Sequence, residues 1–183
     1  MTEVRVLEGV GEIAPAAWNA LVADGSPFLE WAFLASLEEA GCVGEDTGWV
    51  PRPLVAYEDG HPVAACPLYL KGHSEGEFVF DWAWADAAER GGIRYYPKLL
   101  VGVPFTPVVG ARFLTPPGTP RKERRAAVAL LGRALVELCR ENDFSSVHVN
   151  FCRPDELGVL QKVDYLPRVG MQYHWHNEGY RSF

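Results

Sequence analysis

Alternating hydrophobic and polar residues predict a series of short strands along the chain. Glu58-Asp59-Gly60, between two of these stretches, is typical of a tight β-hairpin. Pro67 interrupts the longest stretch, and because proline cannot donate a ladder hydrogen bond we expect a bulge or an edge position there. Residues 78–80 are expected to extend the sheet or line the mouth of a cleft. The other expected strands are residues 4–7, 54–57, 62–70, 98–103, 147–151, 165–169 and 171–176.

Helical spacing of hydrophobic residues predicts helices between these strands. Ser26 and Thr119 are expected N-caps, because their hydroxyls accept hydrogen bonds from the free amides of a first turn. Apart from the short segments 78–80 and 83–90, the resulting order is β-α-α-β-β-β-α-β-α-β-β, which predicts an α/β (α+β) fold with a mixed central sheet flanked by helices. The expected helices cover residues 15–22, 27–40, 83–90, 120–140 and 154–163, with a loop at 42–53.

Composition indicates a single domain and narrows the classes of function. The 183 residues are 48% hydrophobic, which is enough for one well-packed core. The net charge of −7 argues against binding of duplex DNA. No apolar run is long enough to span a bilayer and the N-terminus lacks a signal pattern, so we expect a cytoplasmic protein. Four scattered cysteines suggest reduced thiols, with neither a zinc site nor a disulfide framework.

The stretch from Lys71 to Thr106 combines aromatic and acidic residues in a way that fits neither a plain core nor a plain surface. Buried carboxylates need partners, and aromatic walls with a few polar groups are typical of small-ligand pockets. The alternative is that the aromatic residues pack a core while Glu77 and Asp81 cap turns. If Phe80 and Trp82 desolvate Asp81, its pKa is expected to be raised.

Several residues are candidates for acyl-transfer chemistry. His148 could take a proton from an attacking amine, with Asn150 on the same strand face, although a hydrogen-bonded structural histidine is the alternative. Tyr96, with Tyr95, could donate to an oxyanion, and Lys98 could meet a carboxylate or a phosphate. No metal site is expected, since neither His73 with Glu77 nor His174 with His176 supplies three ligands.

The start of the long helix departs from the usual charge pattern, in which acidic residues occupy the first turn. Basic side chains there would add to the positive end of the helix dipole and suit a phosphate-bearing ligand. A solvated charged turn is the alternative, and the glycine-rich loop expected before such a site is poor. The expected phosphate-binding residues are Arg121, Lys122, Arg124 and Arg125.

The blocks HSEGEFVFDWAWADA, YYPKLLVGVPFTPVVGARFL and SSVHVNFC resemble the FemAB-like family of peptidoglycan biosynthesis or recognition proteins, which is grouped with the GNAT acyltransferases. Family members look like two GNAT-type domains in tandem, so the resemblance implies that residues 1–183 form one GNAT-like domain corresponding to the first. Asp81, Tyr96 and several other residues match motif positions of the family. The others, and also Asn150, are expected to bind substrate: His73, Glu77, Trp82, Trp84, Lys98, Thr106 and Arg112.

The resemblance implies transfer of an acyl or aminoacyl group to an amine. The donor would be acyl-coenzyme A or aminoacyl-tRNA, used as a co-substrate with no tightly bound cofactor, and the acceptor a small molecule or peptide. A non-catalytic half that recognises a cell-wall peptide or a partner remains the alternative. A third possibility, a docking platform for a second domain, predicts an exposed apolar face and self-association.

Overall fold

The computed structural model describes residues 2–22, 25–171 and 173–182 and contains two small sheets. The first has the order β1-β3-β4, and all its strands are antiparallel: β1 (Thr2–Val6), β3 (Leu54–Glu58) and β4 (His61–Cys66). The second has the order β2-β5-β6-β7 and is mixed, because β6 and β7 are parallel: β2 (Trp49–Pro51), β5 (Leu68–Lys71), β6 (Lys98–Val101) and β7 (Val147–Val149).

Prolines divide one long hairpin between the two sheets. Pro67 separates β4 from β5, and Pro53 with its neighbour Arg52 separates β2 from β3. Because proline lacks an amide hydrogen, the regular ladder cannot continue through these positions. The carbonyl of Pro67 instead accepts the amide of Gly102 (3.2 Å) and that of Pro53 accepts the amide of Leu7 (2.9 Å). The interruption expected at Pro67 is confirmed.

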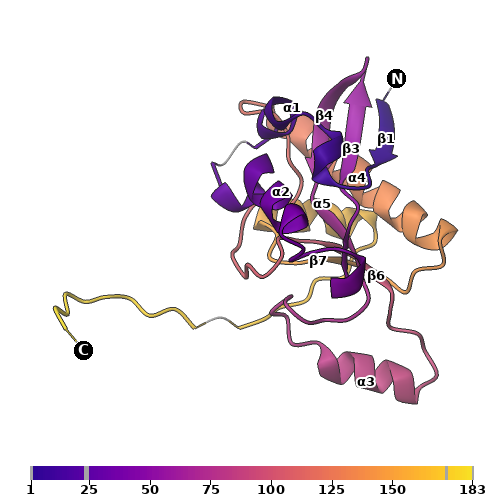
Figure 1. Ribbon diagram of the computed structural model, residues 1–183, viewed down its shortest axis with the longest axis vertical. Coiled ribbons are helices and arrows are strands. Elements are labelled where there is room, and N and C mark those ends of the chain that lie inside the picture. The colour runs from indigo at the N-terminus through magenta and orange to yellow at the C-terminus, as the bar shows by residue number, and fades with distance from the viewer. Residues whose placement is uncertain (1, 23–24, 172, 183) are drawn as a thin grey trace.

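Helices cover both faces of the sheets (Figure 1). On β3, Leu54 and Ala56 face one hydrophobic cluster with α4 (Arg121–Glu141) and α5 (Pro154–Leu160). Val55, between them, faces a second cluster with α1 (Pro15–Asn19) and α2 (Trp31–Glu39). This alternation follows from the two-residue period of a strand. The fold is therefore a single α+β domain, as the sequence predicted.

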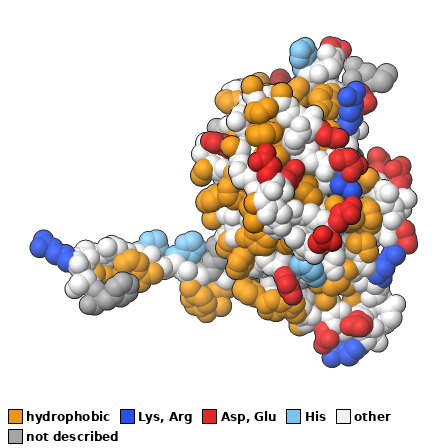
Figure 2. All heavy atoms as spheres, in the orientation of Figure 1, with side chains coloured by type: hydrophobic (Ala, Val, Ile, Leu, Met, Phe, Trp, Pro, Cys, Tyr) orange, Lys and Arg blue, Asp and Glu red, His pale blue; other side chains and the backbone are white. Residues whose placement is uncertain are grey.

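Two segments lie apart from this layered body. The helix α3 (Trp82–Arg90) has no buried residue and stands below the second sheet in Figure 1. The tail after Tyr165 leaves the body on the other side and continues to the C-terminus. Exposed apolar side chains gather on both segments, as Figure 2 shows for the tail.

Several sequence predictions need correction. Residues 165–171 and 173–176 form no strand, since no neighbouring backbone pairs with them, and residue 172 lies outside the described part. Residues 78–80 form no strand but line a groove, which is the second of the two alternatives expected for them. The expected loop at 42–53 contains β2. Thr119 does not cap α4: its hydroxyl donates to the Pro116 carbonyl (2.6 Å), and Pro120 is the N-cap. Ser26 precedes a 3-10 turn, and α2 begins after Glu30.

The described cysteines are all free, and two of the four, Cys66 and Cys139, are buried. Within the described residues, no helix is both long and apolar enough to cross a membrane.

Candidate functional site: a buried ion network between a pocket and a groove

Two lysines lie directly opposite each other in the second sheet. Lys71 ends β5, Lys98 begins β6, and the antiparallel register pairs them. Both are fully buried. Because like charges at paired positions destabilise a sheet, and because buried charges need partners, carboxylates must lie nearby. The loop that follows β5 supplies Glu77 and Asp81, which are also buried.

Lys98 is the centre of the resulting network. Its Nζ lies 2.8 Å from Asp81 Oδ2, 3.1 Å from Glu77 Oε2 and 2.8 Å from Ser74 Oγ. An ammonium group has three hydrogens to donate, so these three acceptors satisfy it completely. Tyr95 adds a further donor to Asp81 Oδ2 (2.8 Å).

One oxygen of each carboxylate remains unused. Glu77 Oε1 and Asp81 Oδ1 are buried and have no hydrogen-bond partner in the described structure. A buried acceptor without a partner carries a cost of about 1–3 kcal/mol, and more for a charged group. These two oxygens are therefore unused acceptors inside the network.

The two carboxylates differ in their pKa. Burial alone would raise the pKa of Asp81, but hydrogen bonds from Lys98, Ser74 and Tyr95 outweigh it and lower the pKa to about 2. The expected raised pKa of Asp81 is therefore wrong. For Glu77, burial dominates over the attraction of Lys98 and raises the pKa. Of the two carboxylates, Glu77 is the one suited to taking up a proton.

Lys71 has weaker compensation than Lys98. Its ammonium lies over the Trp49 ring (3.7 Å to the centroid) and donates to the Glu75 carbonyl (3.3 Å). Burial lowers the pKa of Lys71 to about 7, against the attraction of Glu77. Lys71 is therefore uncharged in a large fraction of molecules near pH 7, which limits the repulsion between the paired lysines.

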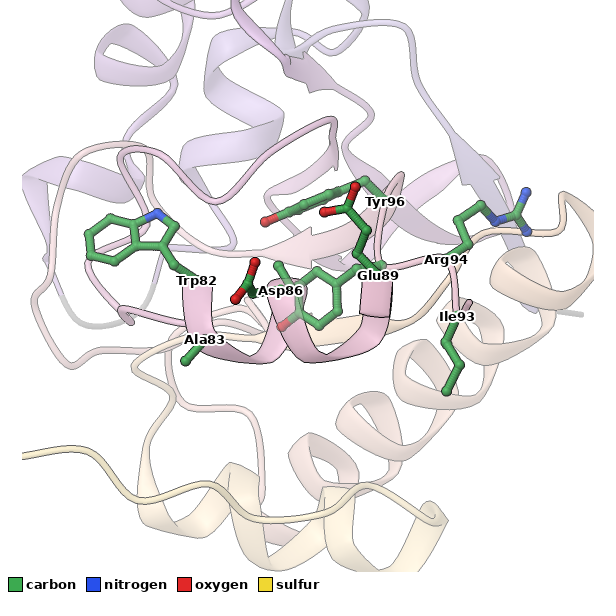
Figure 3. A pocket seen from close by; sticks show the side chains of 9 residues that line it. Trp82, Ala83, Asp86, Glu89, Ile93, Arg94 and Tyr96 are labelled. Atoms are coloured by element: carbon green, nitrogen blue, oxygen red, sulfur yellow. The ribbon is translucent and has the colours of Figure 1, made fainter. Parts of the chain in front are cut away.

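The tyrosines connect the network to a surface pocket of about 670 Å³. Tyr96 Oη lies 2.7 Å from Ser74 Oγ, and both Tyr95 and Tyr96 line the pocket. Figure 3 shows Trp82, Asp86 and Glu89 of α3 on the opposite side, with both carboxylates directed toward Tyr96. The predicted Trp82 and Tyr96 are thus brought together, in a pocket with aromatic and acidic walls.

The positive charges near this pocket are already paired. Arg94, which lines the pocket, lies 2.8 Å from Asp143. Arg90 lies 3.2 Å from Asp86. Glu89 has no ion-pair partner among the described residues, so its carboxylate gives the pocket a preference for cations.

On the other side, His148 and Asn150 border a groove of about 1210 Å³ beside β7. The Asn150 amide reaches Glu77 Oε2 (3.4 Å), and the His148 ring approaches Tyr95 edge-on, at 6.1 Å between centroids. Burial, followed by the charge of Lys98, lowers the pKa of His148 to about 4. The imidazole is therefore neutral near pH 7, as the predicted base would be, but its Nε2 contacts Ser146 Oγ (3.0 Å).

Arg112 and Glu156 join the end of β7 to α5. Glu156 Oε1 accepts the amides of Arg112 (2.8 Å) and Phe113 (2.9 Å), and its Oε2 accepts the amide of Arg153 (2.9 Å). The buried Arg112 side chain donates to the carbonyls of Asn150 (2.7 Å), Ala111 and Val108. The sequence suggested that Arg112 binds substrate. In the structure, its guanidinium donates to backbone carbonyls.

The basic turn lies far from the pocket. Residues 121–125 begin α4, whereas Arg94 at the pocket contacts Asp143, just beyond the end of that helix. A helix of 21 residues is about 31 Å long. Arg124 lies 3.9 Å from Asp155, and its Nε is buried without a partner, which leaves a donor for an anion. Arg121 and Lys122 are exposed.

The remaining predicted residues do not join the network. His73 accepts the Glu75 amide (3.1 Å) and contacts the Thr47 carbonyl (2.9 Å). Thr106 donates to the Pro104 carbonyl (3.0 Å). Trp84 is exposed, with the Arg168 guanidinium 5.5 Å from its ring centroid. Across the described ranges, no three His, Cys, Asp or Glu side chains gather as a metal site would require.

A family model described as peptidoglycan biosynthesis/recognition, FemAB-like, matches residues 9–183. The chain belongs to the FemAB-like family. A search of curated proteins found no match. The resemblance inferred from the sequence blocks is confirmed for this FemAB-like chain.

Three solved structures are similar to the FemAB-like chain. A ribosomal-protein-alanine N-acetyltransferase from Brucella melitensis biovar Abortus 2308 has 14% identity and a TM-score of 0.49, over 96% of this chain and 100% of that one. A glucosamine-6-phosphate N-acetyltransferase from Arabidopsis thaliana has 11% identity and a TM-score of 0.49, over 97% and 99%. A GCN5-related N-acetyltransferase from Ralstonia eutropha JMP134 has 15% identity and a TM-score of 0.45, over 96% and 99%.

Sequence reasoning missed three members of the FemAB-like site. Ser74 links Tyr96 to Lys98, Lys71 pairs with Lys98, and Glu156 fixes the backbone around Arg112. Lys71 carried a usable signal, since a lysine that ends a strongly hydrophobic strand is exceptional. Ser74 carried none, because only the fold of the loop brings it to Lys98.

Proposed function

We propose that this FemAB-like domain transfers an acyl or aminoacyl group to an amine. The observation that carries the proposal is the continuous path from the pocket into the core: Tyr96 Oη, Ser74 Oγ, Lys98 Nζ and Glu77 Oε2 follow one another at 2.7, 2.8 and 3.1 Å. An amine enters such a pocket as an ammonium ion and must lose a proton before it can attack a carbonyl.

The path can accept that proton. Lys98 first gives a proton to Glu77, because an ammonium has no lone pair with which to accept one. The neutral Lys98 amine then turns to accept a proton from Ser74, Ser74 takes one from Tyr96, and Tyr96 Oη takes one from the substrate ammonium. The net result is a protonated Glu77 and an unchanged Lys98 ammonium. The raised pKa of Glu77 supports this role, whereas the low pKa of Asp81 keeps that carboxylate charged beside Lys98.

The neutral amine then forms the new C–N bond as the bond between the carbonyl carbon and the sulfur or oxygen of the donor breaks. The nitrogen loses a second proton as it becomes an amide. The leaving group takes the proton held by Glu77, by the same path, and the second proton from the nitrogen is released to solvent. Orientation of amine and carbonyl in a fixed pocket supplies a large part of the acceleration in such reactions. Of the predicted residues, Tyr96, Lys98 and Glu77 carry these roles, and Asp81 and Asn150 position them.

The donor is proposed to be acyl-coenzyme A, with its phosphates at Arg121, Lys122, Arg124 and Arg125. Arg124 with its free buried Nε supports an anion there. A series of contacts leads from this turn toward the network: Arg124 with Asp155, the neighbouring Glu156 with Arg112, Arg112 with Asn150, and Asn150 with Glu77.

The test is a thermal-shift titration with coenzyme A and acetyl-coenzyme A, because specific binding raises the unfolding midpoint with ligand concentration. Replacing Arg121, Lys122, Arg124 and Arg125 together by alanine should abolish the shift. Replacing Arg133 and Arg140, two exposed arginines of the same helix, should leave it unchanged. No shift at millimolar ligand would remove acyl-coenzyme A as donor and leave aminoacyl-tRNA.

A recognition module is the second candidate, favoured by exposed aromatic rings at the pocket and at the groove. Trp82 at the pocket is 57% exposed, Phe78 and Phe80 at the groove are 46 and 66% exposed, and Trp84 of α3 is 63% exposed. Saturable binding of a cell-wall peptide, unchanged when Tyr96 is replaced by phenylalanine and without release of product, would favour recognition over catalysis.

A further inference from the structure

The C-terminal tail has the side-chain pattern of a strand, but its described residues form no ladder with another strand. Val169, Met171, Tyr173 and Trp175 occupy alternate positions and are 93, 77, 88 and 73% exposed. In an extended chain these residues lie on one face. An apolar stripe of this kind on an isolated segment marks a surface that is covered by another chain.

The outer edge of β7 has no neighbouring strand among the described residues. β7 is the last strand of its sheet, and its only described neighbour is β6. The Ser146 carbonyl and the Asn150 amide bond to β6, at 2.9 and 3.0 Å. Since backbone groups alternate in direction along a strand, the amides and carbonyls of Val147 and Val149 point away from β6. They are free to pair with an added strand.

The groove of about 1210 Å³ lies along this edge and has an apolar lining. Val147 and Val149 pack on the core side of the sheet. Residues of α4 and α5 continue that apolar side, and tail residues border the groove as well. The groove residues from the two helices are Val136, Cys139, Arg140, Leu157 and Leu160.

The chain's own tail borders the groove but forms no ladder with β7 among the described residues. Tyr165 Oη donates to the Gly132 carbonyl (2.9 Å), which fixes the start of the tail on α4. Arg168 donates to the Val79 carbonyl (3.1 Å) and lies over the Trp84 ring. These contacts direct the following residues away from the body, as Figure 1 shows. The gap beside β7 therefore remains for a strand from another molecule.

We infer that the gap is filled by residues 169–175 of a second copy of this chain, in a reciprocal exchange. Each chain adds its tail as a strand to β7 of the other chain, so the same pair of surfaces meets twice, as an isologous twofold dimer requires. Added to β7, the stripe of Val169, Met171, Tyr173 and Trp175 lies on the apolar side, with Val147 and Val149. His174 then lies on the side of His148. The inference does not depend on the proposed function.

The first test measures the oligomeric state by light scattering after gel filtration, over a range of concentrations. A concentration-dependent dimer is expected. Met171→Glu and Tyr173→Glu should each raise the dimer dissociation constant at least about 30-fold, as loss of a central interface anchor does. The matched control His176→Glu places the same charge on the opposite face and should change the constant by less than about threefold. A monomer at millimolar chain concentration would overturn the inference.

The second test shows which tail occupies the groove. A photo-crosslinking phenylalanine analogue replaces Tyr173, and ¹⁴N- and ¹⁵N-labelled chains are mixed before irradiation. Crosslinks between light and heavy chains, reaching peptides of residues 136–160, are expected. Crosslinks confined to chains of one label would show that the tail folds back on its own β7. Crosslinks that avoid this region would place the dimer contact elsewhere, and either result overturns the inference.

Discussion

Removal of the Lys98 charge is the sharpest probe of the buried network. Lys98→Met leaves Glu77 Oε2 and Asp81 Oδ2, 3.1 and 2.8 Å from the lost ammonium, without their counter-ion in a fully buried site. Breaking a buried ion pair by removing one partner costs about 3–5 kcal/mol. For a domain of this size each kcal/mol lowers the midpoint by about 2–4 °C, so we expect a loss of about 6–20 °C.

The matched control neutralises the whole network. In Lys98→Met combined with Glu77→Gln and Asp81→Asn, no buried charge is left uncompensated at this point, and most of the lost stability should return. Urea unfolding followed by circular dichroism gives the free energies for all variants. In the single variant the carboxylates are expected to bind protons more readily, so its deficit should shrink as the pH falls toward 4. A deficit below about 1 kcal/mol at pH 7 would refute the assigned role of Lys98.

Three further variants or conditions test other parts of the structure. The folded-state pKa of Asp81 is about 2, below its ordinary value of 3.8. The stability that the charged Asp81 contributes is therefore present above pH 4 and is lost as the pH falls toward 2. Asp81→Asn should remove that part of an acid-unfolding curve. Glu156→Gln weakens three hydrogen bonds from backbone amides and should lower the free energy of unfolding in urea by about 2–3 kcal/mol. An equal loss for Glu141→Gln, at an exposed position, would contradict this reasoning. Gly48→Ala places a methyl group 2.5 Å from His73 Nε2 at φ 65° and should lower the free energy of unfolding by about 1–3 kcal/mol, a loss that a Gly11→Ala control with open space should not show.

The sequence was sufficient to predict most elements because their signals are local. The hydrophobic stripe of α4, the hairpin at Asp59-Gly60 and the interruption at Pro67 each depend on a few neighbouring residues. Tail strands were predicted at residues 165–169 and 171–176, but a strand forms only where a neighbouring backbone accepts its hydrogen bonds.

The site was predicted in composition but not in geometry. Glu77 and Asp81 are buried while Phe78 and Phe80, beside them, are 46 and 66% exposed. Both phenylalanines have left-handed backbone angles, φ 58° and 51°, which bulky residues seldom adopt. This backbone breaks the alternation on which sequence reasoning depends. The pKa of Asp81 was mispredicted for a related reason, since the three donors to Asp81 come from positions 74, 95 and 98.

The separation of α3 from the core has a consequence for local unfolding. With no buried residue, the helix contributes almost nothing to global stability, and its backbone can open while both sheets stay intact. Its two ends are nevertheless tied to the core, through Asp81 to Lys98 at the start and through Tyr96 to Ser74 beyond the end. Melting and refolding of these nine residues would therefore open and close the pocket at little free-energy cost, without disturbing the ion network beneath it.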